Sequence, residues 1–188
     1  MRYGILGVLG LVIALAGCEV PPPEPQTAPN GTPLPTVTII QPGDRSRIKL
    51  RIIDSVNTLR AARGLAPLEY DRALNSAALT HARDMSVQNR PWHFGSDGSS
   101  PIDRVARAGY RGRLLGENIS ETYETDVQTL NAWMTELSTR SVIMDPNARH
   151  LGFDWFQEPN GKIWWTLITG APPPEVPVAE GGAAPRQG

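Results

Sequence analysis

Prolines crowd both ends of this 188-residue chain and tryptophans occur only in its middle, which limits where a packed core can form. Eight prolines lie within residues 20–43 and five within residues 171–186, whereas all five tryptophans lie within residues 92–165. Proline lacks the N–H group that helices and sheets use, while tryptophan contributes large apolar area to a core. We therefore expect a single folded domain over residues 44–170.

The segments on either side of that domain have predicted roles of their own. The first 17 residues hold an apolar run that is shorter than the ~20 residues of a membrane-spanning helix, so they are predicted to be a signal peptide. The run ends in Leu15-Ala16-Gly17-Cys18, which resembles a bacterial lipobox, in which the cysteine carries the lipid after cleavage. We expect lipidation at Cys18, a Pro-rich linker over residues 18–43 and a disordered Pro/Gly/Ala tail over residues 171–188.

A lipid at Cys18 would make the membrane a partner and would hold the protein on a bacterial cell envelope, facing the periplasm or the exterior. Glu19 differs from the aspartate that commonly marks retention in the inner membrane, so both membranes stay open. The alternative is an ordinary signal peptide in which the cysteine is incidental.

Charge and cysteine content exclude several kinds of function. Residues 44–170 hold 16 Lys plus Arg against 15 Asp plus Glu, without runs of one sign. A surface that binds nucleic acid concentrates positive charge, so nucleic acid is not expected as a partner. Cys18 is the only cysteine, and the domain therefore has no thiol for a disulfide, a nucleophile or a zinc ligand.

Apolar residues at three- or four-residue steps predict four helices. The first covers residues 45–63. Asp71 caps the second, and His81 lies in the middle of its apolar stripe, so we expect a hydrogen-bonded core histidine there rather than a ligand. A third is expected over residues 100–108, and a fourth begins near residue 125. The stripe of the fourth helix comprises Val127, Leu130, Trp133, Met134 and Leu137.

Strand signals are interspersed with these helices. Residues 150–169 contain two β-branched and aromatic runs separated by Glu158-Pro159-Asn160-Gly161, which predicts a β-hairpin. Residues 114–120 predict a further strand. The expected fold class is therefore α+β, with a three-layer α-β-α sandwich.

Four polar residues stand in local patterns that core packing does not explain: His93, Glu117, Glu136 and His150. Glycines after His93 predict a loop, Glu117 lies at the mouth of a predicted strand, and Glu136 lies on the flank of the fourth predicted helix. Two imidazoles and two carboxylates that converge would make a metal or acid–base site. Each also has a structural alternative, as a surface or solvated side chain.

The same segments, in this order and near this spacing, resemble the CAP superfamily of cysteine-rich secretory, antigen-five and pathogenesis-related-one proteins, also called SCP domains. His93 and the Gly-Ser-Asp-Gly-Ser that follows Phe94 are similar to His-Thr-Gly-Ser-Asp-Gly-Ser of bacterial members. Gly116-Glu117-Asn118 is similar to a family signature, and His150-Leu151-Gly152 to the segment of the second site histidine.

Glu136 matches a different branch of that family. Bacterial members usually carry Ser-Pro-Gly-His-Arg after the tryptophan, whereas this chain has Glu136-Leu137-Ser138-Thr139-Arg140, with Thr139 in place of the histidine. Glutamate at position 136 is similar to the Trp-Tyr-Ser-Glu pattern of eukaryotic members, where it belongs to the site.

The resemblance implies a CAP sandwich with a cleft formed by His93, Glu117, Glu136 and His150. In that cleft, His93 and His150 would hold zinc or another divalent cation, or the tetrad would bind a polar head group. CAP proteins are associated with sterol or lipid binding, metal binding and, in a few cases, proteolysis. We therefore expect foremost an envelope-anchored ligand-binding module, whose ligand includes a lipid or another small apolar molecule.

Two alternatives stay open. The first is a metal-dependent hydrolase of envelope peptide, glycan or lipid, with Glu117 and Glu136 as the catalytic candidates. The second is a tethered interaction domain in which the tetrad is a structural polar network. The chain has neither a His-Glu-x-x-His nor a Gly-x-Ser-x-Gly segment, which favours binding over catalysis.

Overall fold

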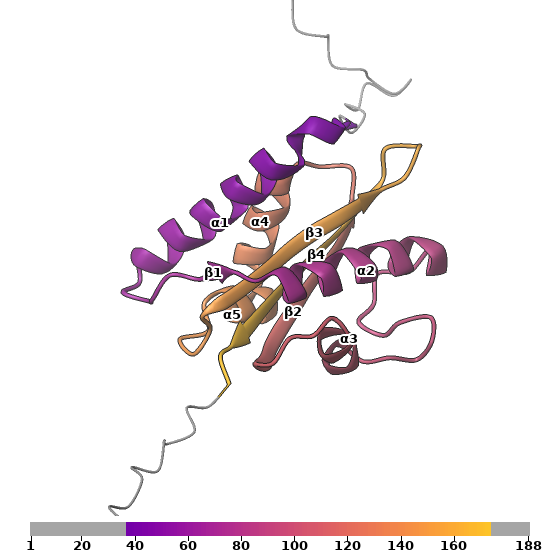
Figure 1. Cartoon of the computed structure of the whole chain (residues 1–188). Helices are drawn as coiled ribbons and strands as arrows, with labels where there is room; N and C mark the ends of the chain where they lie inside the picture. The colour runs from indigo at the N-terminus through magenta and orange to yellow at the C-terminus, as the bar shows by residue number, and fades with distance from the viewer. Residues whose placement is uncertain (1–36, 174–188) are drawn as a thin grey trace, which may run out of the picture. The chain divides into compact units, whose positions relative to one another are not determined.

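The computed structural model describes residues 37–173, so the predictions for the signal peptide, for Cys18 and for most of the tail lie outside the described residues (Figure 1). The described elements are η1 (Pro42–Asp44), α1 (Arg45–Ala61), β1 (Glu69–Tyr70), α2 (Arg72–Gln88), α3 (Pro101–Arg107), β2 (Arg113–Thr122), α4 (Asp126–Thr135), α5 (Leu137–Ile143), β3 (His150–Gln157) and β4 (Ile163–Ala171).

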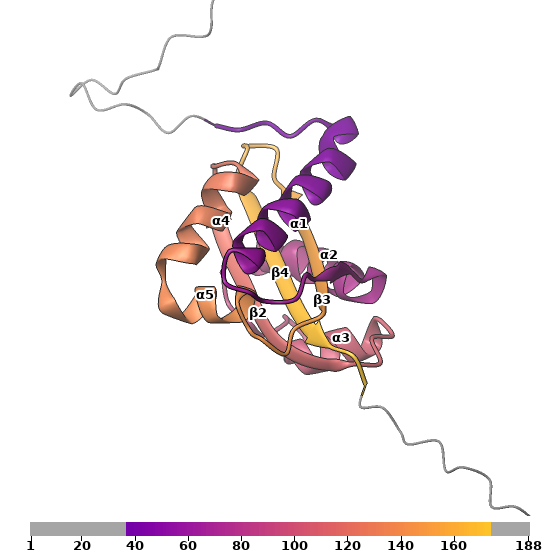
Figure 2. The same ribbon diagram turned by 90° about the vertical axis from the view of Figure 1, so that its left-hand side faces the viewer.

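These elements form three layers around one sheet, whose strand order is β1-β3-β4-β2. Helices α1, α4 and α5 cover one face, and α2 and α3 cover the other (Figure 2). The predicted α+β class and the α-β-α sandwich are confirmed. Within residues 37–173, no helix combines the length and the apolar character that a membrane crossing requires.

Three helices begin where the sequence predicts, because their caps form. The carboxylate of Asp71 accepts a hydrogen bond from the N–H of Leu74 at the start of α2. Ser100 and Thr125 each form a capping box, with Asp103 and Gln128 respectively, at the starts of α3 and α4. A cap satisfies backbone N–H groups that the first helical turn leaves without partners, so the cap residue fixes where the helix starts.

The prediction of a single fourth helix is wrong, because the helix is interrupted at Glu136. This residue is extended (φ −84°, ψ 133°) and separates α4 from α5. The hydroxyl of Thr139 donates to the carbonyl of Trp133, and the guanidinium of Arg140 donates to the carbonyl of Met134. These bonds satisfy carbonyl groups in the last turn of α4. Leu137, which was expected in the apolar stripe, follows the break and is 71% exposed.

Alternation along the strands divides the core between the two faces of the sheet. Leu151, Phe153 and Trp155 of β3 join Trp165 of β4 in the core under α1 and α4. The rings of Phe153 and Trp165 stack, with centroids 5.6 Å apart. Residues at the other parity, such as Trp164, face α2. The predicted hairpin and third strand are confirmed by β3, β4 and β2.

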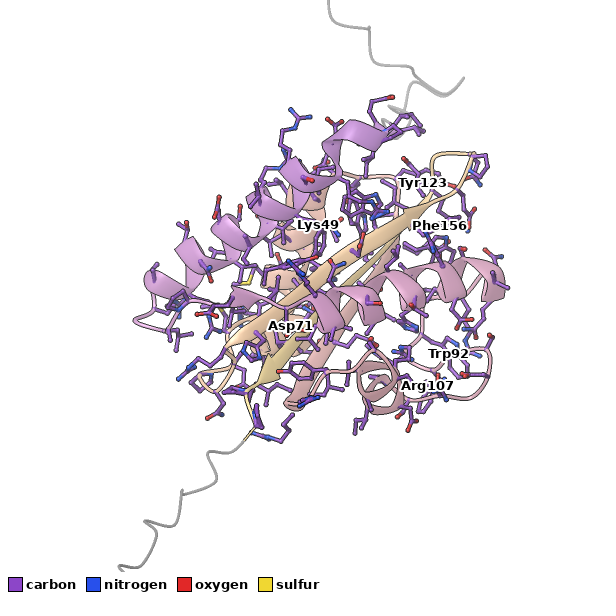
Figure 3. All side chains as sticks on the ribbon, viewed as in Figure 1. Lys49, Asp71, Trp92, Arg107, Tyr123 and Phe156 are labelled. Carbon is purple, nitrogen blue, oxygen red and sulfur yellow. The ribbon has the colours of Figure 1, made fainter. Side chains whose placement is uncertain are left out.

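Two residues of β3 fix the helices closely to the sheet. A Cβ atom at Gly152 would overlap the backbone of α2 at Leu74 and Asn75, so only glycine permits this approach. The buried carboxylate of Asp154 accepts hydrogen bonds from Arg45 and Lys49 of α1 and from Asn75 of α2. Lys49 lies over β3 in Figure 3.

The described chain enters and leaves the domain at opposite ends of the sheet (Figure 1). At entry, the N–H of Thr38 donates to the carbonyl of Tyr123, and the side chain of Gln157 bonds the backbone of Thr38 and Ile40. These contacts lie beside the turn between β3 and β4. The exit follows the last residue of β4, Ala171, which pairs with Arg113 at the start of β2.

Candidate functional site

Four side chains from four segments meet under the sheet face that α2 and α3 cover. Glu117 comes from the centre of β2, His81 from α2, Arg104 from α3, and His93 from the loop between those helices. Glu117 lies on this face because successive side chains of a strand point to opposite faces of the sheet. Its neighbour Asn118 points to the other face, where its side chain donates to the carbonyl of Thr139.

The carboxylate of Glu117 is the centre of this cluster. Arg104 Nη2 donates to both Glu117 oxygens, at 2.9 and 2.8 Å. His93 Nδ1 lies 2.9 Å from Glu117 Oε1. Arg104 Nη1 also donates to the carbonyl oxygen of His93, at 2.9 Å, and thereby fixes the loop that carries the imidazole. The side chains of Arg104 and Glu117 are 5% and 2% exposed, so this ion pair is buried.

The protonation states of the cluster follow from these contacts. Burial alone would raise the pKa of Glu117, but the hydrogen bond from His93, the charges of His81 and Arg104 and the hydrogen bond from Arg104 outweigh it and lower that pKa. Glu117 is therefore an anion at neutral pH. A carboxylate only accepts hydrogen bonds, so His93 Nδ1 carries the proton and neutral His93 keeps a lone pair at Nε2. The His93 side chain is 49% exposed.

His81 is buried, as the sequence predicts, but the predicted hydrogen bond is wrong, because neither ring nitrogen has a hydrogen-bond partner within residues 37–173. Its Nε2 atom is 3.7 Å from Glu117 Oε1, which is too long for a hydrogen bond. Burial lowers the pKa of His81, against the smaller opposing effect of the Glu117 charge. His81 is therefore neutral at pH 7 and does not compete with Arg104 for the carboxylate.

Of the four residues in the predicted tetrad, the structure brings together only His93 and Glu117. His150 begins β3 and bonds the hydroxyl of Tyr110 through Nδ1, at 2.9 Å, while that hydroxyl donates to the carbonyl of Ala171. Burial raises the pKa of Tyr110 to about 12, so the hydroxyl stays protonated. Glu136 is exposed at the break between α4 and α5, the helices of the opposite face.

The residues that are present do not fit the zinc site that the sequence suggests. Zinc sites of the catalytic type use three protein ligands and a water molecule. Within residues 37–173, no group of three or more His, Cys, Asp or Glu side chains could hold a metal ion. Arg104 binds both oxygens of Glu117 and His81 is fully buried, so His93, whose side chain is 49% exposed, is the imidazole of the cluster that reaches the surface.

Arg104 belongs to this cluster, although the sequence did not indicate it. Nothing in the local pattern distinguishes it from Arg107, one turn later, which is exposed and pairs with Asp97 at 2.6 Å. Figure 3 shows Arg107 and Trp92 on the side of the molecule that carries this loop and α3. The difference arises from the sheet, because only the Arg104 side of α3 faces β2.

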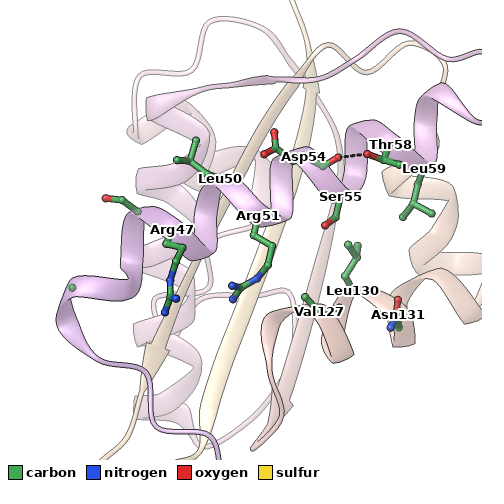
Figure 4. Close-up of a pocket in the computed structure, with 12 residues that line it drawn as sticks. Arg47, Leu50, Arg51, Asp54, Ser55, Thr58, Leu59, Val127, Leu130 and Asn131 are labelled. Carbon is green, nitrogen blue, oxygen red and sulfur yellow. Dashed lines mark hydrogen bonds between the residues drawn. The ribbon is translucent and has the colours of Figure 1, made fainter. Parts of the chain in front are cut away.

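A separate groove lies between α1 and α4, on the opposite face from the Glu117 cluster (Figure 4). Its cavity volume is about 910 Å³. Apolar side chains line much of it, and two arginines lie toward the start of α1. The apolar lining residues are Leu50, Leu59, Val127 and Leu130, and the charged ones are Arg47, Arg51 and Asp54.

Comparison with known proteins gives a consistent picture. The family model described as CAP, the cysteine-rich secretory protein family, matches residues 53–168, which is more than half of the chain. The Bacillus subtilis protein YkwD, described as uncharacterized, is 29% identical over 133 residues, covering 71% of this chain and 51% of YkwD. The chain thus spans about half the length of this relative. The uncharacterized membrane protein YlbC of Bacillus subtilis is 28% identical over 102 residues, covering 54% of this chain and 30% of YlbC.

Solved structures share the fold. An extracellular protein of Bacillus anthracis with an SCP domain superposes with a TM-score of 0.63 at 21% identity, covering 71% of this chain and 45% of that one. An outer surface protein of Borrelia burgdorferi superposes with a TM-score of 0.59 at 16% identity, covering 67% of this chain and 93% of that one. At these identities the likeness concerns the fold.

Proposed function

The chain belongs to the CAP family of cysteine-rich secretory proteins, and we propose that it is an exported binding module that holds the apolar chain of an amphiphile in the groove between α1 and α4. The observation that supports this proposal is the groove itself, because it combines an apolar lining with charged side chains at one end. Ligand sites are typically concave and largely apolar, with a few polar groups that orient the ligand.

Two of the apolar side chains that line the groove are exposed to solvent. Leu50 of α1 is 62% exposed and Val127 of α4 is 38% exposed. Both line the groove together with Leu59 and the buried Leu130. Exposed apolar residues that adjoin one another mark ligand or partner sites more often than scattered ones do. An acyl chain laid between the two helices would cover these residues.

Two arginines lie at one end of the groove, and each is paired with an aspartate. Arg51 is held by two hydrogen bonds to the buried carboxylate of Asp126, at 2.8 and 2.7 Å, and its side chain is 40% exposed. Arg47 is 69% exposed and pairs with Asp44 on the surface. Asp54, which has no cationic partner among residues 37–173, also lines the groove, so the apolar chain of the ligand rather than the charge of its head group should determine binding there.

The groove can be tested with palmitate, by its displacement of a fluorescent fatty acid from the full chain. Leu50→Asp should weaken palmitate binding at least about tenfold, because it puts a charge against the acyl chain. Ile102→Asp is the matched control, since Ile102 is 66% exposed on α3, outside the groove, and should leave binding unchanged. Equal binding by the two variants, or no displacement by the unaltered chain, would reject the proposal.

Export and lipid anchoring complete the proposal. The two solved relatives are named as an extracellular protein and an outer surface protein, which supports export of this chain. The lipobox-like Leu15-Ala16-Gly17-Cys18 supports a lipid anchor at Cys18. Cys18→Ser should release the protein from membranes of a bacterial host on fractionation, and its continued partition into the membrane fraction would contradict the anchor.

A second candidate function is acid–base catalysis by His93, and the observation that favours it is the hydrogen bond from His93 Nδ1 to the buried Glu117. A carboxylate behind an exposed imidazole orients the ring, as in hydrolytic dyads. For a hydrolase of envelope peptide, glycan or lipid, His93→Gln should abolish turnover without loss of the fold. Turnover that survives this change would exclude the role.

A further inference from the structure

The groove between α1 and α4 adjoins a further cavity at the end away from Arg47, where Figure 4 shows Leu59. Leu59 lines both, and the further cavity has a volume of about 400 Å³, within the usual range for small-molecule sites of about 300–1,000 Å³. Its larger apolar lining residues, all at least partly exposed, are Leu59, Leu65, Met134, Leu137 and Met144. The cavity therefore extends the apolar surface of the groove towards α5.

Two arginines without acidic partners line this cavity. Arg63 and Arg140 form no ion pair among residues 37–173, and no Asp or Glu lines the cavity with them. Nη1 of Arg140 donates to the carbonyl of Met134, at 3.2 Å, which positions its guanidinium beside the cavity. The lining thus carries two positive charges and no negative one, which favours an anion that accepts from guanidinium N–H groups.

The opposite end of the groove does not compete for such an anion. The two arginines at that end are each paired with an aspartate. The carboxylate of Asp54 lines the groove without a cationic partner among residues 37–173 and would repel a negative head group. An anion therefore has one favourable place along this surface, beside Arg63 and Arg140.

The spacing along α1 suits one acyl chain with its head group at that place. Leu50 and Leu59 are nine residues apart, which is roughly 14 Å at the rise of 1.5 Å per helical residue. One acyl chain spans half of the ~30 Å hydrocarbon core of a bilayer, or about 15 Å. A chain that covers Leu50 and ends at Leu59 therefore brings its head group to Arg63, four residues further along.

We propose that Arg63 and Arg140 form the head-group subsite for a single-chain anionic amphiphile whose apolar chain lies in the groove between α1 and α4. This proposal rests on the proposed function, because it takes the groove as the site of the chain. It adds the sign of the charge on the head group and its position. The methylene groups next to the head group contact Leu137, which is 71% exposed.

The test is calorimetric titration of the full chain with laurate and with 1-dodecanol, which share one chain length and differ in the charge of the head group. Arg63→Gln/Arg140→Gln should weaken laurate binding about tenfold and leave dodecanol binding unchanged. Added sodium chloride should weaken the binding of laurate only. Arg83→Gln/Arg111→Gln is the matched control, since it removes the same charge at exposed positions that line neither cavity, and it should change neither affinity.

Ser141→Glu tests the charge with both arginines in place. Ser141 is exposed and lines the cavity, so the new carboxylate would pair with the guanidinium groups. Laurate binding should again fall about tenfold, without a change for dodecanol.

Three results would overturn the subsite and leave the groove proposal standing. These are dodecanol binding without laurate binding by the unaltered chain, laurate binding that survives both sets of substitutions, and equal losses for the two ligands, which would indicate a change in the shape of the cavity. If the unaltered chain binds neither ligand, the groove proposal and the subsite are both rejected.

Discussion

At the scale of single residues, Glu117 shows how one buried charge organises a site. Its carboxylate is 2% exposed and stays ionised because Arg104 and His93 bind it. An ion pair in this position stabilises a protein little compared with apolar packing, but removal of one partner leaves an uncompensated charge in the interior. The pair therefore secures the geometry of the site more than the stability of the fold.

This balance predicts an asymmetric mutational result. Arg104→Met should lower the free energy of unfolding by about 3–5 kcal/mol at pH 7, because Glu117 keeps its charge without its partner. The double variant Arg104→Met/Glu117→Met should recover much of that loss. Urea unfolding, followed by tryptophan fluorescence, measures both. A single variant as stable as the unaltered protein would show that water reaches Glu117.

His81 predicts a dependence of stability on pH. Burial lowers its pKa in the folded state below the unfolded value of about 6.5, so the unfolded chain binds a proton more readily. Its contribution to stability is therefore fully present above pH 6.5 and is lost as the pH falls from 6.5 through the folded pKa. The charged groups that face it are Glu117, Arg104 and Asp84.

His81→Gln should make the fall in unfolding free energy between pH 6.5 and 5 shallower, by no more than about 1.4 kcal/mol per pH unit. Glu117 does not confuse the measurement, because its pKa is lowered from 4.5 and its own stabilising effect is lost only below that pH. Urea unfolding at several pH values gives the slopes. Equal slopes in the two proteins would mean that His81 keeps an ordinary pKa.

At the scale of elements, α2 crosses β3 in close contact at Gly152. An alanine there would push against the backbone of Leu74 and Asn75, neither of which can move without displacing the helix. Gly152→Ala should therefore destabilise the fold by about 3 kcal/mol. Gly43→Ala is the control, since no atom lies within 4 Å of its added Cβ, and its melting temperature should hardly change. A similar melting temperature for both variants would contradict this packing.

Helix starts were predictable and one helix end was not, for a physical reason. Asp71, Ser100 and Thr125 carry their capping information in their own side chains. The break at Glu136 depends instead on bonds that Thr139 and Arg140 make back to α4. The apolar spacing from Trp133 to Leu137 continues across the break, so periodicity alone indicated an unbroken helix.

At the scale of the whole molecule, the candidate site shows what sequence leaves open. The loop around His93 and the strand that holds Glu117 were recognisable from local patterns, although Glu117 lies at the centre of that strand and not at its mouth, and the structure joins the two residues. Whether Glu136 and His150 join the same cluster depends on which face of the sheet each segment covers and on strand order. Those facts arise from long-range packing, which local patterns do not encode.

The separation of the tetrad predicts a result for zinc. Because His93 and His150 bond to different partners, they do not form one metal site. Calorimetric titration at neutral pH should therefore give the same zinc affinity for the unaltered chain and for His93→Ala/His150→Ala. Tight binding that disappears in the double variant would show that the four residues rearrange around the metal.

The entry and exit of the chain at opposite ends of the sheet have a mechanical consequence. Tension between an anchored N-terminus and anything held at the C-terminus would run along β4, which lies between β2 and β3. Antiparallel hydrogen bonds lie across the strand direction, so such a pull would shear both ladders at once instead of opening them one bond at a time. We therefore expect the domain to resist a pull between these two ends through the combined strength of both ladders.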